Sequence, residues 1–478
     1  MKIKLSKISV GVVLLLIVSS FKSLEKEAPK KESKKNVLFI MIDDLRPELS
    51  IYGQNQISSP SIESLAKTGV TFESAYCNVP VCGASRASLL TGKRPTSSRF
   101  LRYNASIKKE ASDVLTIAKH FKNNGYTTIS NNKIIHLKND APGSWDEEWY
   151  PYKKGWRNYI SKVNIDLENI GEHGYPYESP DVEDTDYFDG QTAEKSILDL
   201  KKFKKDNKPF FLAVGFVKPH LPFNAPKKYW DLYDFKKIAL PENAVFPESA
   251  PKAASHNWGE LRYYKDIPKK GAVPDSIAKK LIHGYYAAVS YVDAQVGKVI
   301  NALDELGLRE NTVIVLVGDH GWSLSEHGLW AKHSNFSVAL QVPLIISASG
   351  IPKNKRTNSV AELIDLYPTL CELTNNTKPT HLDGKSLVKS LKNPSKIYNT
   401  SAWARYQKGE TLISGNYFYT EWQRNDNTFA KMLYDHSNDP NETINLADDK
   451  NYKSTVDHLS TLLNQRIKKY KTSELKNN

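Results

Sequence analysis

Two apolar runs constrain the fold of this chain more than any other feature of its sequence. Residues 36–42 read NVLFIMI and residues 311–318 read NTVIVLVG, with almost no polar residue inside either run. Such runs are typical of strands buried on both faces, as in a parallel sheet that lies between helices. The run PFFLAVGF at residues 209–216 predicts another such strand. We therefore expect an α/β fold with a mixed, mostly parallel sheet between helices.

Polar residues of the kinds that can bind a metal ion follow two of these predicted strands directly. Asp43 and Asp44 come after the first run, and Asp319 and His320 come after the second. Because ligands of α/β sheets bind beyond the carboxyl ends of the strands, side chains far apart in the sequence can meet there. Grouped carboxylate oxygens bind hard divalent cations, which predicts a metal site. The alternative is that each aspartate caps a helix or forms a turn, where this residue is common.

Lysines and histidines follow other predicted strands. Lys133 and His136 come after a short buried strand, Lys218 and His220 come after the third apolar run, and Lys332 lies in a polar loop before a later strand. Long charged side chains are exposed surface residues by default. Their positions at the ends of strands make them candidates for a site beside the carboxylates.

Three segments predict helices. Residues 276–306 carry valines at helical spacing and end before Gly307, and residues 112–124 have an amphipathic pattern. Residues 85–90 should start a further helix, which places Cys82 at a helix N-terminus. Backbone N–H groups at that position favour an anion.

The segment at residues 138–189 is polar, rich in glycine and rich in aromatic residues. A long irregular stretch inside an α/β unit is more often a binding loop than a core element, and aromatic rings suit the faces of sugars. The alternative is a local hydrophobic cluster, because aromatic residues dominate both kinds of packing.

The formal net charge of the 478 residues is +13, which admits nucleic acid, an anionic membrane or an anionic substrate as partner. The sequence contains no zinc-finger spacing and no RNA-binding aromatic signature, and its lysines are dispersed. We therefore expect an anionic small molecule or polysaccharide and no nucleic acid. Cys77, Cys82 and Cys371 do not make a disulfide framework, and pairing of Cys77 with Cys371 stays open.

The N-terminus predicts export. Residues 1–23 combine a basic start with a short apolar core, which is typical of a secretory signal peptide and short for a membrane span. Residues 24–35 form a polar linker, residues 36–375 a catalytic domain and residues 376–478 a smaller C-terminal α+β subdomain. We expect a bacterial protein, secreted or periplasmic, without stable membrane insertion after signal cleavage. An uncleaved anchor is the alternative.

The stretch Cys82-Gly83-Ala84-Ser85-Arg86, continued to Thr91-Gly92, resembles the signature of type I sulfatases of the alkaline phosphatase superfamily. The resemblance covers nearly the whole mature chain, and the iduronate-type members match best. Further matching stretches are Asp43 to Pro47, Lys133 to His136, Phe211 to Phe223, Asp319 to Trp322 and Gly328 to Lys332. The resemblance implies an alkaline-phosphatase-like fold. Without it, Cys82 could be a buried structural thiol.

The resemblance also implies a modified nucleophile and a metal ion. In this family a maturation enzyme oxidises the cysteine, here Cys82, to Cα-formylglycine. The geminal diol of its hydrate can expel sulfate through the second hydroxyl, whereas a serine would keep a stable sulfate ester. The ligands implied for one calcium ion are Asp43, Asp44, Asp319 and His320, together with the modified Cys82.

The same resemblance assigns roles to the basic residues. Arg86 and Lys133 hold the hydrated aldehyde, and Lys332 neutralises the sulfate oxygens. His220 or Lys332 is the candidate donor of a proton to the departing sugar oxygen, and His136 is the candidate base for sulfate release. The further candidates for substrate contact are Lys218, Arg99, Arg102, Trp330 and Arg405.

Taken together, these features predict a secreted sulfatase that acts on a sulfated oligosaccharide or polysaccharide. The predicted substrate is a 2-O-sulfated uronic acid or a related sugar of a glycosaminoglycan or of an algal polysaccharide such as ulvan. The formylglycine-generating enzyme is a further expected partner. The alternatives are a phosphatase or phosphodiesterase on the same scaffold, and a noncatalytic polysaccharide-binding protein.

Overall fold

The computed structural model describes residues 34–477, except residues 153–154, 258 and 425–426. The predicted signal peptide lies outside the described residues, and so does most of the predicted polar linker. Among the described residues, no helix has the length and apolar character needed to span a membrane.

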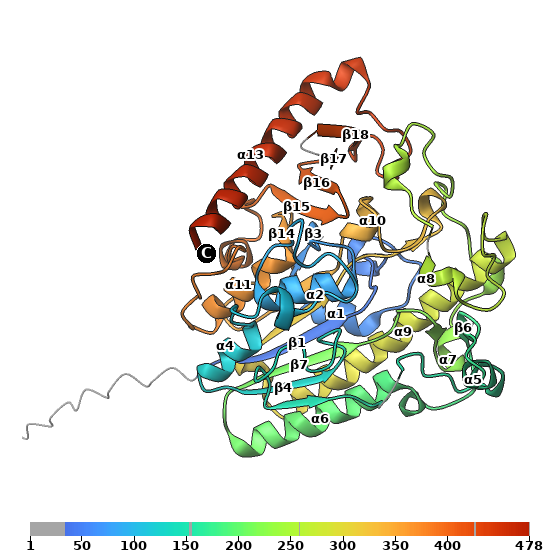
Figure 1. Ribbon diagram of the computed structural model, residues 1–478. Coiled ribbons are helices and arrows are strands. Elements are labelled where there is room, and N and C mark those ends of the chain that lie inside the picture. The colour runs from blue at the N-terminus through green and yellow to red at the C-terminus, as the bar shows by residue number, and fades with distance from the viewer. Residues whose placement is uncertain (1–33, 153–154, 258, 425–426, 478) are drawn as a thin grey trace, which may run out of the picture. The chain divides into compact units, whose positions relative to one another are not determined.

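A mixed eight-stranded sheet lies in the middle of the fold, and its three central strands are the apolar runs of the sequence (Figure 1). β1 (Asn36–Ile42) lies between β7 (Phe210–Phe216) and β9 (Thr312–Gly318) and is parallel to both. Every residue of these strands is buried, which explains why their sequences lack polar alternation. Beyond β7 lie β4 (Thr127–Asn132) and β5 (Glu147–Trp149), and beyond β9 lie β12 (Leu344–Ser347), β2 (Val70–Phe72) and β13 (Lys355–Thr357). The predicted α/β class is confirmed.

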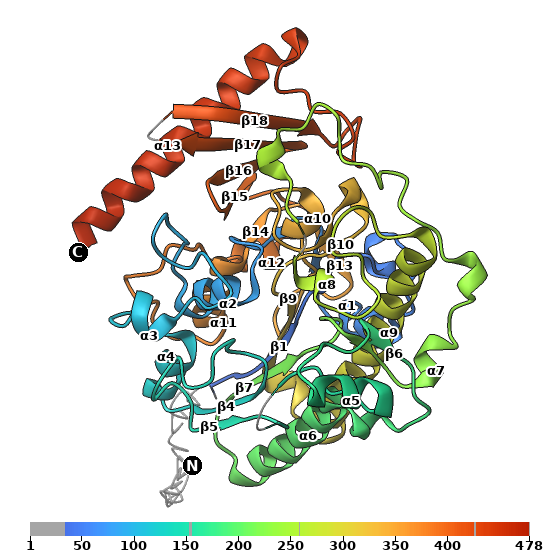
Figure 2. The ribbon, with the colours of Figure 1, turned by 45° about the vertical axis from the view of Figure 1, so that its right-hand side comes forward.

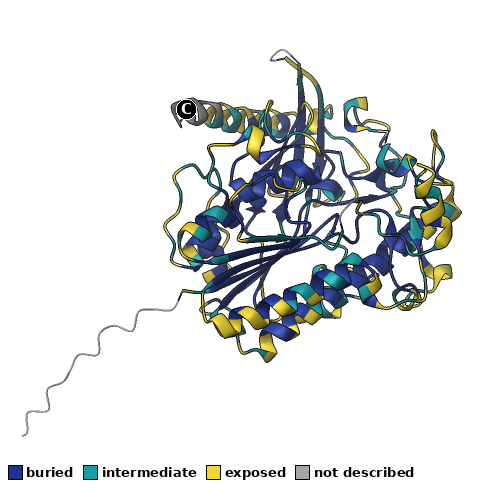
Figure 3. Ribbon diagram, turned by 60° about the horizontal axis from the view of Figure 1, so that its bottom comes forward, coloured by how far each residue is buried: buried dark blue, intermediate teal, exposed yellow. Residues whose placement is uncertain are grey.

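Helices cover both faces of the sheet (Figures 1 and 2). The helices α6 (Phe188–Asp206) and α9 (Asp275–Glu305) pack together on one face. On the other face lie α2 (Cys82–Thr91), α4 (Ile117–Asn123) and α11 (Leu366–Leu373). Figure 3 shows buried strands in the interior and exposed residues on the outer sides of the helices. The layers leave the strand ends as the place where polar side chains can gather.

One of the predicted helices is confirmed, and another starts later than predicted. The helix predicted at residues 276–306 is confirmed as α9, and its valine stripe is buried. The helix predicted at residues 112–124 is wrong in its first turn, because α4 starts only at Ile117. Thr116 ends the preceding segment, and its hydroxyl caps the helix by accepting a hydrogen bond from the Lys119 N–H at 3.2 Å.

The segment at residues 138–189 is more regular than its composition suggested. β5 extends the central sheet, α5 (Lys162–Asn169) follows, and β6 (Tyr177–Glu178) pairs with β8 (Phe223–Asn224). The expectation of an irregular loop was therefore wrong for these elements. Trp145 is buried in the core, as the alternative of a hydrophobic cluster requires, whereas Trp156 is 39% exposed. A sugar-binding role of this segment stays a prediction.

The C-terminal part is an antiparallel four-stranded sheet with a long helix, α13 (Lys453–Asn477). Its strands are β15 (Ser401–Tyr406), β16 (Gly409–Ser414), β17 (Tyr417–Arg424) and β18 (Asn427–Asp435). Apolar residues of this sheet and of α13 share a separate small core. A smaller C-terminal α+β subdomain agrees with this arrangement, and the exact boundary at residue 375 stays a prediction.

Short elements complete the fold. They are α1 (Pro60–Ala66), α3 (Ile107–Glu110), α7 (Lys227–Trp230), α8 (Gly259–Arg262), α10 (Ser337–Leu340), α12 (Val388–Lys392), β3 (Ala75–Tyr76), β10 (Ser323–Leu324), β11 (Trp330–Ala331) and β14 (Ala361–Glu362). All three cysteines are free and buried, so Cys77 and Cys371 do not pair.

Candidate active site

The register of the central strands brings two acids to one level of the sheet. Ile42, the last residue of β1, pairs with Phe216 of β7 and with Gly318 of β9. Asp43 and Asp319 are the next residues after β1 and β9. The Asp43 N–H donates to the Phe216 carbonyl at 3.2 Å, and the Asp319 N–H donates to the Ile42 carbonyl at 3.3 Å. The backbone ladder therefore continues through both acids and fixes where their side chains start.

Lys133 enters the same place from β4. Asn132 pairs with Gly215 of β7, and the Lys133 N–H donates to the Gly215 carbonyl at 3.2 Å. A Cβ atom at residue 215 would lie 2.2 Å from the Lys133 carbonyl, so a glycine is required for the two segments to approach this closely. The small residue in an otherwise bulky strand is thus what lets Lys133 reach the edge of the sheet.

Cys82 is the first residue of α2 and follows an extended N-cap residue. A Cβ atom on the next residue, Gly83, would lie 1.9 Å from the carbonyl oxygen of Tyr103, which explains the glycine inside the motif. The Ser85 hydroxyl donates to the Asp319 carbonyl at 2.6 Å and holds the start of the helix against the end of β9. Backbone N–H groups at the start of the helix favour an anion beside Cys82.

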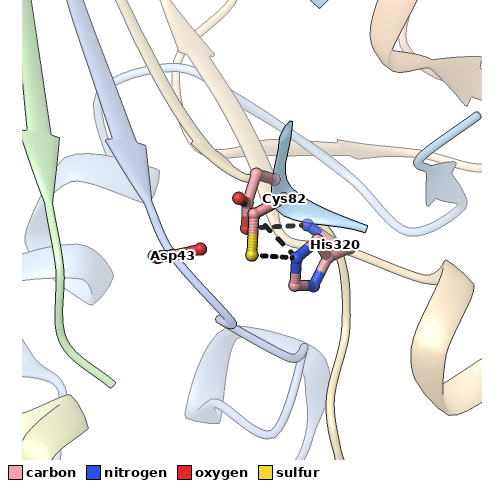
Figure 4. A group of neighbouring side chains, drawn as sticks. Asp43, Cys82 and His320 are labelled. Carbon is pink, nitrogen blue, oxygen red and sulfur yellow. Dashed lines mark hydrogen bonds and ion pairs between the residues drawn. The ribbon is translucent and has the colours of Figure 1, made fainter. Parts of the chain in front are cut away.

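Four candidate metal ligands converge beside the helix. One ligand atom each of Asp43, Cys82, Asp319 and His320 lies within 4.8 Å of the others, and all four residues are buried. Figure 4 shows the Cys82 sulfur facing the His320 ring, at 3.1 Å from Nε2, with Asp43 nearby. His320 Nδ1 lies 3.0 Å from the carbonyl oxygen of Gly321. A proton on Nδ1 that bonds this carbonyl leaves the Nε2 lone pair directed at the group, as in metal-binding histidines.

Arg86 and Lys133 bring positive charge to these acids. Arg86 Nε donates to Asp319 Oδ2 at 2.8 Å, and its Nη2 atom lies 3.3 Å from Asp43 Oδ1. Arg86 Nη1 also donates to the Lys133 carbonyl, and the Lys133 ammonium forms an ion pair with Asp43. One guanidinium therefore joins the ends of three strands.

Asp44 lies beside the four candidate ligands, with its Oδ1 atom 3.5 Å from His320 Nε2, and the carboxylates here are not equivalent. Burial raises the pKa of Asp43, but the charges of Lys133 and Arg86 outweigh burial and hold it well below its usual value. Burial, aided by the charge of Asp43, raises the pKa of Asp44 and of Asp319 despite the cations beside them. The charged forms of Asp44 and Asp319 are thus unfavourable unless a further cation is present.

The donor set fits a divalent cation. Both buried oxygens of Asp43 lack a hydrogen bond from the described residues and face only ion-pair partners. Burial, together with the charge of Asp43, raises the pKa of the Cys82 thiol to about 12, so the sulfur is neutral. Carboxylate oxygens therefore supply the charge of the group, as hard cations require.

Lys332 and His220 form a second side of the site. Lys332 Nζ lies 3.1 Å from Asp44 Oδ1 and 4.8 Å from the centre of the Trp322 ring. His220 Nε2 lies 3.0 Å from Glu260 Oε1, and Glu260 Oε2 lies 3.0 Å from Lys332 Nζ. One carboxylate therefore joins the two residues that the sequence predicted as proton donors.

His136 lies close to the same group and is neutral. Burial, followed by the charge of Lys133, lowers the pKa of His136 to about 3. Its Nδ1 atom is buried and has no hydrogen-bond partner in the described part of the chain. The unpaired nitrogen is free to accept, but the low pKa makes the ring a weak base while the charge of Lys133 is beside it.

The candidate substrate contacts have other surroundings. Lys218 is buried, and its ammonium donates to the carbonyl oxygens of His220 and Pro222, so it holds the loop that carries His220. Arg99 contacts the C-terminal helix, Arg102 is exposed, Trp330 is in the core and Arg405 pairs with Glu410. Their roles in substrate binding stay predictions.

Glu260 is the residue at this site that sequence reasoning missed. It lies in α8, a four-residue helix inside a polar segment rich in proline. No apolar run or motif precedes it, so the sequence carries no local signal that it meets His220 and Lys332.

Comparison with known proteins identifies the family. A family model described as sulfatase matches residues 35–376. The chain belongs to the sulfatase family. A second model, described as N-sulphoglucosamine sulphohydrolase, C-terminal, matches residues 325–469. The resemblance read from the Cys82 motif is therefore confirmed.

Two relatives of this sulfatase are iduronate 2-sulfatases. It is 35% identical to the Mus musculus protein over 382 residues, which covers 72% of this chain and 69% of the relative. It is 33% identical to the Homo sapiens protein over 431 residues, which covers 80% and 78% of the two chains. Family and relatives together make this protein a sulfuric ester hydrolase.

A solved structure supports the fold. A protein in complex with its substrate, D-glucosamine-2-N,6-O-disulfate, matches with a TM-score of 0.74 at 20% identity, over 92% of this chain and 99% of the other. At this level of identity the likeness shows the fold alone, which agrees with the mixed α/β architecture described above.

Proposed function

We propose that this sulfatase removes sulfate from a sulfated carbohydrate, with Cys82 converted to Cα-formylglycine as the nucleophile. The observation that carries the proposal is the position of Cys82 at the start of α2, where its sulfur lies within 4.8 Å of carboxylate oxygens of Asp43 and Asp319. A nucleophile at this position lies beside both the helix N-terminus and a group of ligands for a cation.

Calcium is the ion that we propose for the three aspartates and His320. When bound, the ion supplies charge neutralisation, and the formylglycine hydrate supplies an oxygen nucleophile that can later release sulfate. Three cations, Arg86, Lys133 and Lys332, form ion pairs with the three aspartates and with Glu260. A divalent ion would give these groups a net positive charge, which suits an anionic sulfate ester.

The basic side chains around Cys82 have different roles in the proposed reaction. Arg86 and Lys133 lie where they can hold an oxygen at position 82, and Lys332 where it can neutralise sulfate oxygens. His136, neutral in its buried place, accepts the proton whose removal releases sulfate. His220 and Lys332 face the departing sugar oxygen.

A 2-O-sulfated uronic acid or a related sugar is the substrate that we propose. The names of the two relatives support a sulfated uronate, and the basic charge of the chain supports an anionic polysaccharide such as a glycosaminoglycan or ulvan. The proposal includes export through the signal peptide at residues 1–23 and a formylglycine-generating enzyme as partner.

The nucleophile is tested by replacing Cys82. Protein from a host with the maturation enzyme should carry the mass of formylglycine at residue 82 and release sulfate, whereas Cys82→Ala should release none. Cys371→Ala is the matched control, because Cys371 is also a free, buried cysteine but lies in α11. Full turnover by Cys82→Ala, or by protein with a plain thiol at residue 82, would disprove the proposal.

The substrate is tested with a panel of defined sulfated oligosaccharides. Ion chromatography of released sulfate should show the highest kcat/KM for a sulfated uronate, and matched phosphate monoesters should react more slowly. A preference for the phosphate monoesters would instead indicate a phosphatase. Tight binding of glycans without release of sulfate would indicate a noncatalytic binding protein.

A further inference from the structure

Glu260 holds together two basic side chains of the site, His220 and Lys332, that come from distant loops. Its Oε1 atom lies 3.0 Å from His220 Nε2 and 3.3 Å from Lys332 Nζ, and its Oε2 atom lies 3.0 Å from the same Lys332 nitrogen. Only 23% of the Glu260 side chain is exposed, and the side chains of His220 and Lys332 are almost fully buried. Partly desolvated pairs of this kind fix geometry more strongly than surface pairs do.

The contacts of His220 define its hydrogen bonds. Its Nδ1 atom lies 2.6 Å from the carbonyl oxygen of Leu221, and its Nε2 atom faces the Glu260 carboxylate. Both partners are oxygen acceptors, so both contacts are hydrogen bonds only when each ring nitrogen carries a proton. Burial, followed by the charges of Lys133 and Lys332, lowers the pKa of His220 to about 4, and Glu260 is the strongest of the influences that raise it. The second proton therefore depends on the Glu260 carboxylate that Nε2 faces.

His220 also faces the reacting group. One of its ring nitrogens lies within 4.8 Å of both the Cys82 sulfur and an Asp44 oxygen. The ammonium of Lys332, in contrast, lies between two carboxylates, those of Asp44 and Glu260. The ammonium is therefore fixed as a charge, whereas the imidazole has its Nε2 atom beside Glu260 and a ring nitrogen within 4.8 Å of the Cys82 sulfur.

We propose that Glu260 is a positioning residue for departure of the leaving group, which holds His220 as the proton donor and Lys332 as the fixed charge on the sulfate. This inference rests on the proposed sulfatase reaction and divides the roles of its two candidate donors. As the sulfur–oxygen bond breaks, its electron pair stays on the sugar oxygen. That oxygen takes the proton of His220 Nε2 and leaves as an alcohol. Sulfur forms its new bond to the alkoxide oxygen of the formylglycine hydrate proposed at residue 82, and the imidazole becomes neutral.

The dependence on the leaving group tests this inference. An aryl sulfate whose phenol is acidic leaves without a proton, whereas a sugar alkoxide needs one. We expect Glu260→Gln, which keeps the shape and removes the charge, to lower kcat on a sulfated sugar by about 10²-fold, in the range of general acid catalysis. The kcat on 4-nitrocatechol sulfate should change by less than about threefold, because loss of general acid catalysis does not slow such a substrate.

Controls separate this role from a structural one. Glu172→Gln, at an exposed carboxylate 3.9 Å from Lys265, should leave both activities unchanged. Glu260→Asp, which restores the charge on a shorter side chain, should recover part of the activity on the sugar sulfate. Equal losses on both substrates, or no loss on either, would overturn the inference. A wild-type protein inactive on both substrates would instead contradict the proposed function itself.

Discussion

Two buried carboxylates of this sulfatase have opposite surroundings. Glu362 accepts hydrogen bonds from both terminal nitrogens of Arg94 at 2.7 and 2.8 Å, from Arg466 at 3.2 Å and from the Trp403 N–H at 2.9 Å. Burial raises its pKa, but these partners, Arg94 first, outweigh burial and lower it to about 2. At Asp44 burial prevails, and the pKa is raised well above its usual value.

This difference in pKa distinguishes a structural carboxylate, Glu362, from a candidate metal ligand, Asp44. A carboxylate with a full set of donors has no free coordination position and serves to join segments, here the loop after α2 to the C-terminal helix. A carboxylate whose charge is unfavourable in the empty protein gains most from a bound cation. Asp44 and Asp319 are of the second kind, and both lie beside the candidate metal ligands that follow β1 and β9. The predictions below test whether this contrast holds.

The largest effect is expected from Glu362→Gln. Removal of this charge leaves Arg94 and Arg466 without their shared partner in a buried place, which typically costs about 3–5 kcal/mol. Urea denaturation should show that loss in the free energy of unfolding, while kcat of the folded protein stays unchanged. Glu372→Gln, at an exposed pair with Lys378, is the control and should cost less than about 1 kcal/mol. A fall in kcat without loss of stability would contradict the contrast.

Asp44→Asn should have the reverse effect to Glu362→Gln, because it should lower the activity without lowering the stability. The amide removes a candidate metal ligand, so kcat/KM for sulfate release should fall by about 10²–10³-fold, as for loss of an electrostatic group in an active site. In the presence of a chelator its melting temperature should equal or exceed that of the wild type, because the charged carboxylate is unfavourable there. A melting temperature several degrees lower would mean that Asp44 is a structural carboxylate.

Calcium gives the third test. Chelation should abolish sulfate release, and calcium at a hundred times its Kd should restore it and stabilise the protein by about 2.7 kcal/mol. Thermal denaturation measures the shift directly. The shift should persist in Glu362→Gln and vanish in Asp44→Asn. An equal shift in both variants would show that the ion binds elsewhere.

Asp184→Asn should have the smallest effect, because Asp184 is an intermediate case. Burial raises its pKa, and hydrogen bonds from Lys228 and Lys298 outweigh burial and lower it to about 2. Both lysines are partly exposed, so we expect a loss of only about 1 kcal/mol at neutral pH.

The sign of the pH dependence at Asp184 follows from that lowered pKa. Because the unfolded value is about 3.9, the stabilisation is present above that pH and disappears as the pH falls towards 2. Denaturation of the wild type and of Asp184→Asn should therefore converge over this interval. A difference that grows as the pH falls would contradict the assignment.

The sequence by itself determined the central strands, the helix predicted at residues 276–306 and the acids at the ends of β1 and β9. It also placed Cys82 at a helix N-terminus, although the helix was predicted from Ser85 and α2 starts at Cys82. These features depend on local patterns, because a strand buried on both faces must be apolar and a helix N-terminus follows from the motif itself. The regular structure within residues 138–189 was not predicted, because its short strands show no local pattern and form by pairing with distant strands.

Only the tertiary structure decided that Glu260 meets His220 and Lys332, that Arg86 joins three strand ends, and that Asp43 and Asp44 differ in pKa. A loop without periodicity has no sequence pattern that predicts which distant residues it will contact. The pKa of a buried carboxylate depends on the number and position of its neighbours, which no spacing in the sequence records.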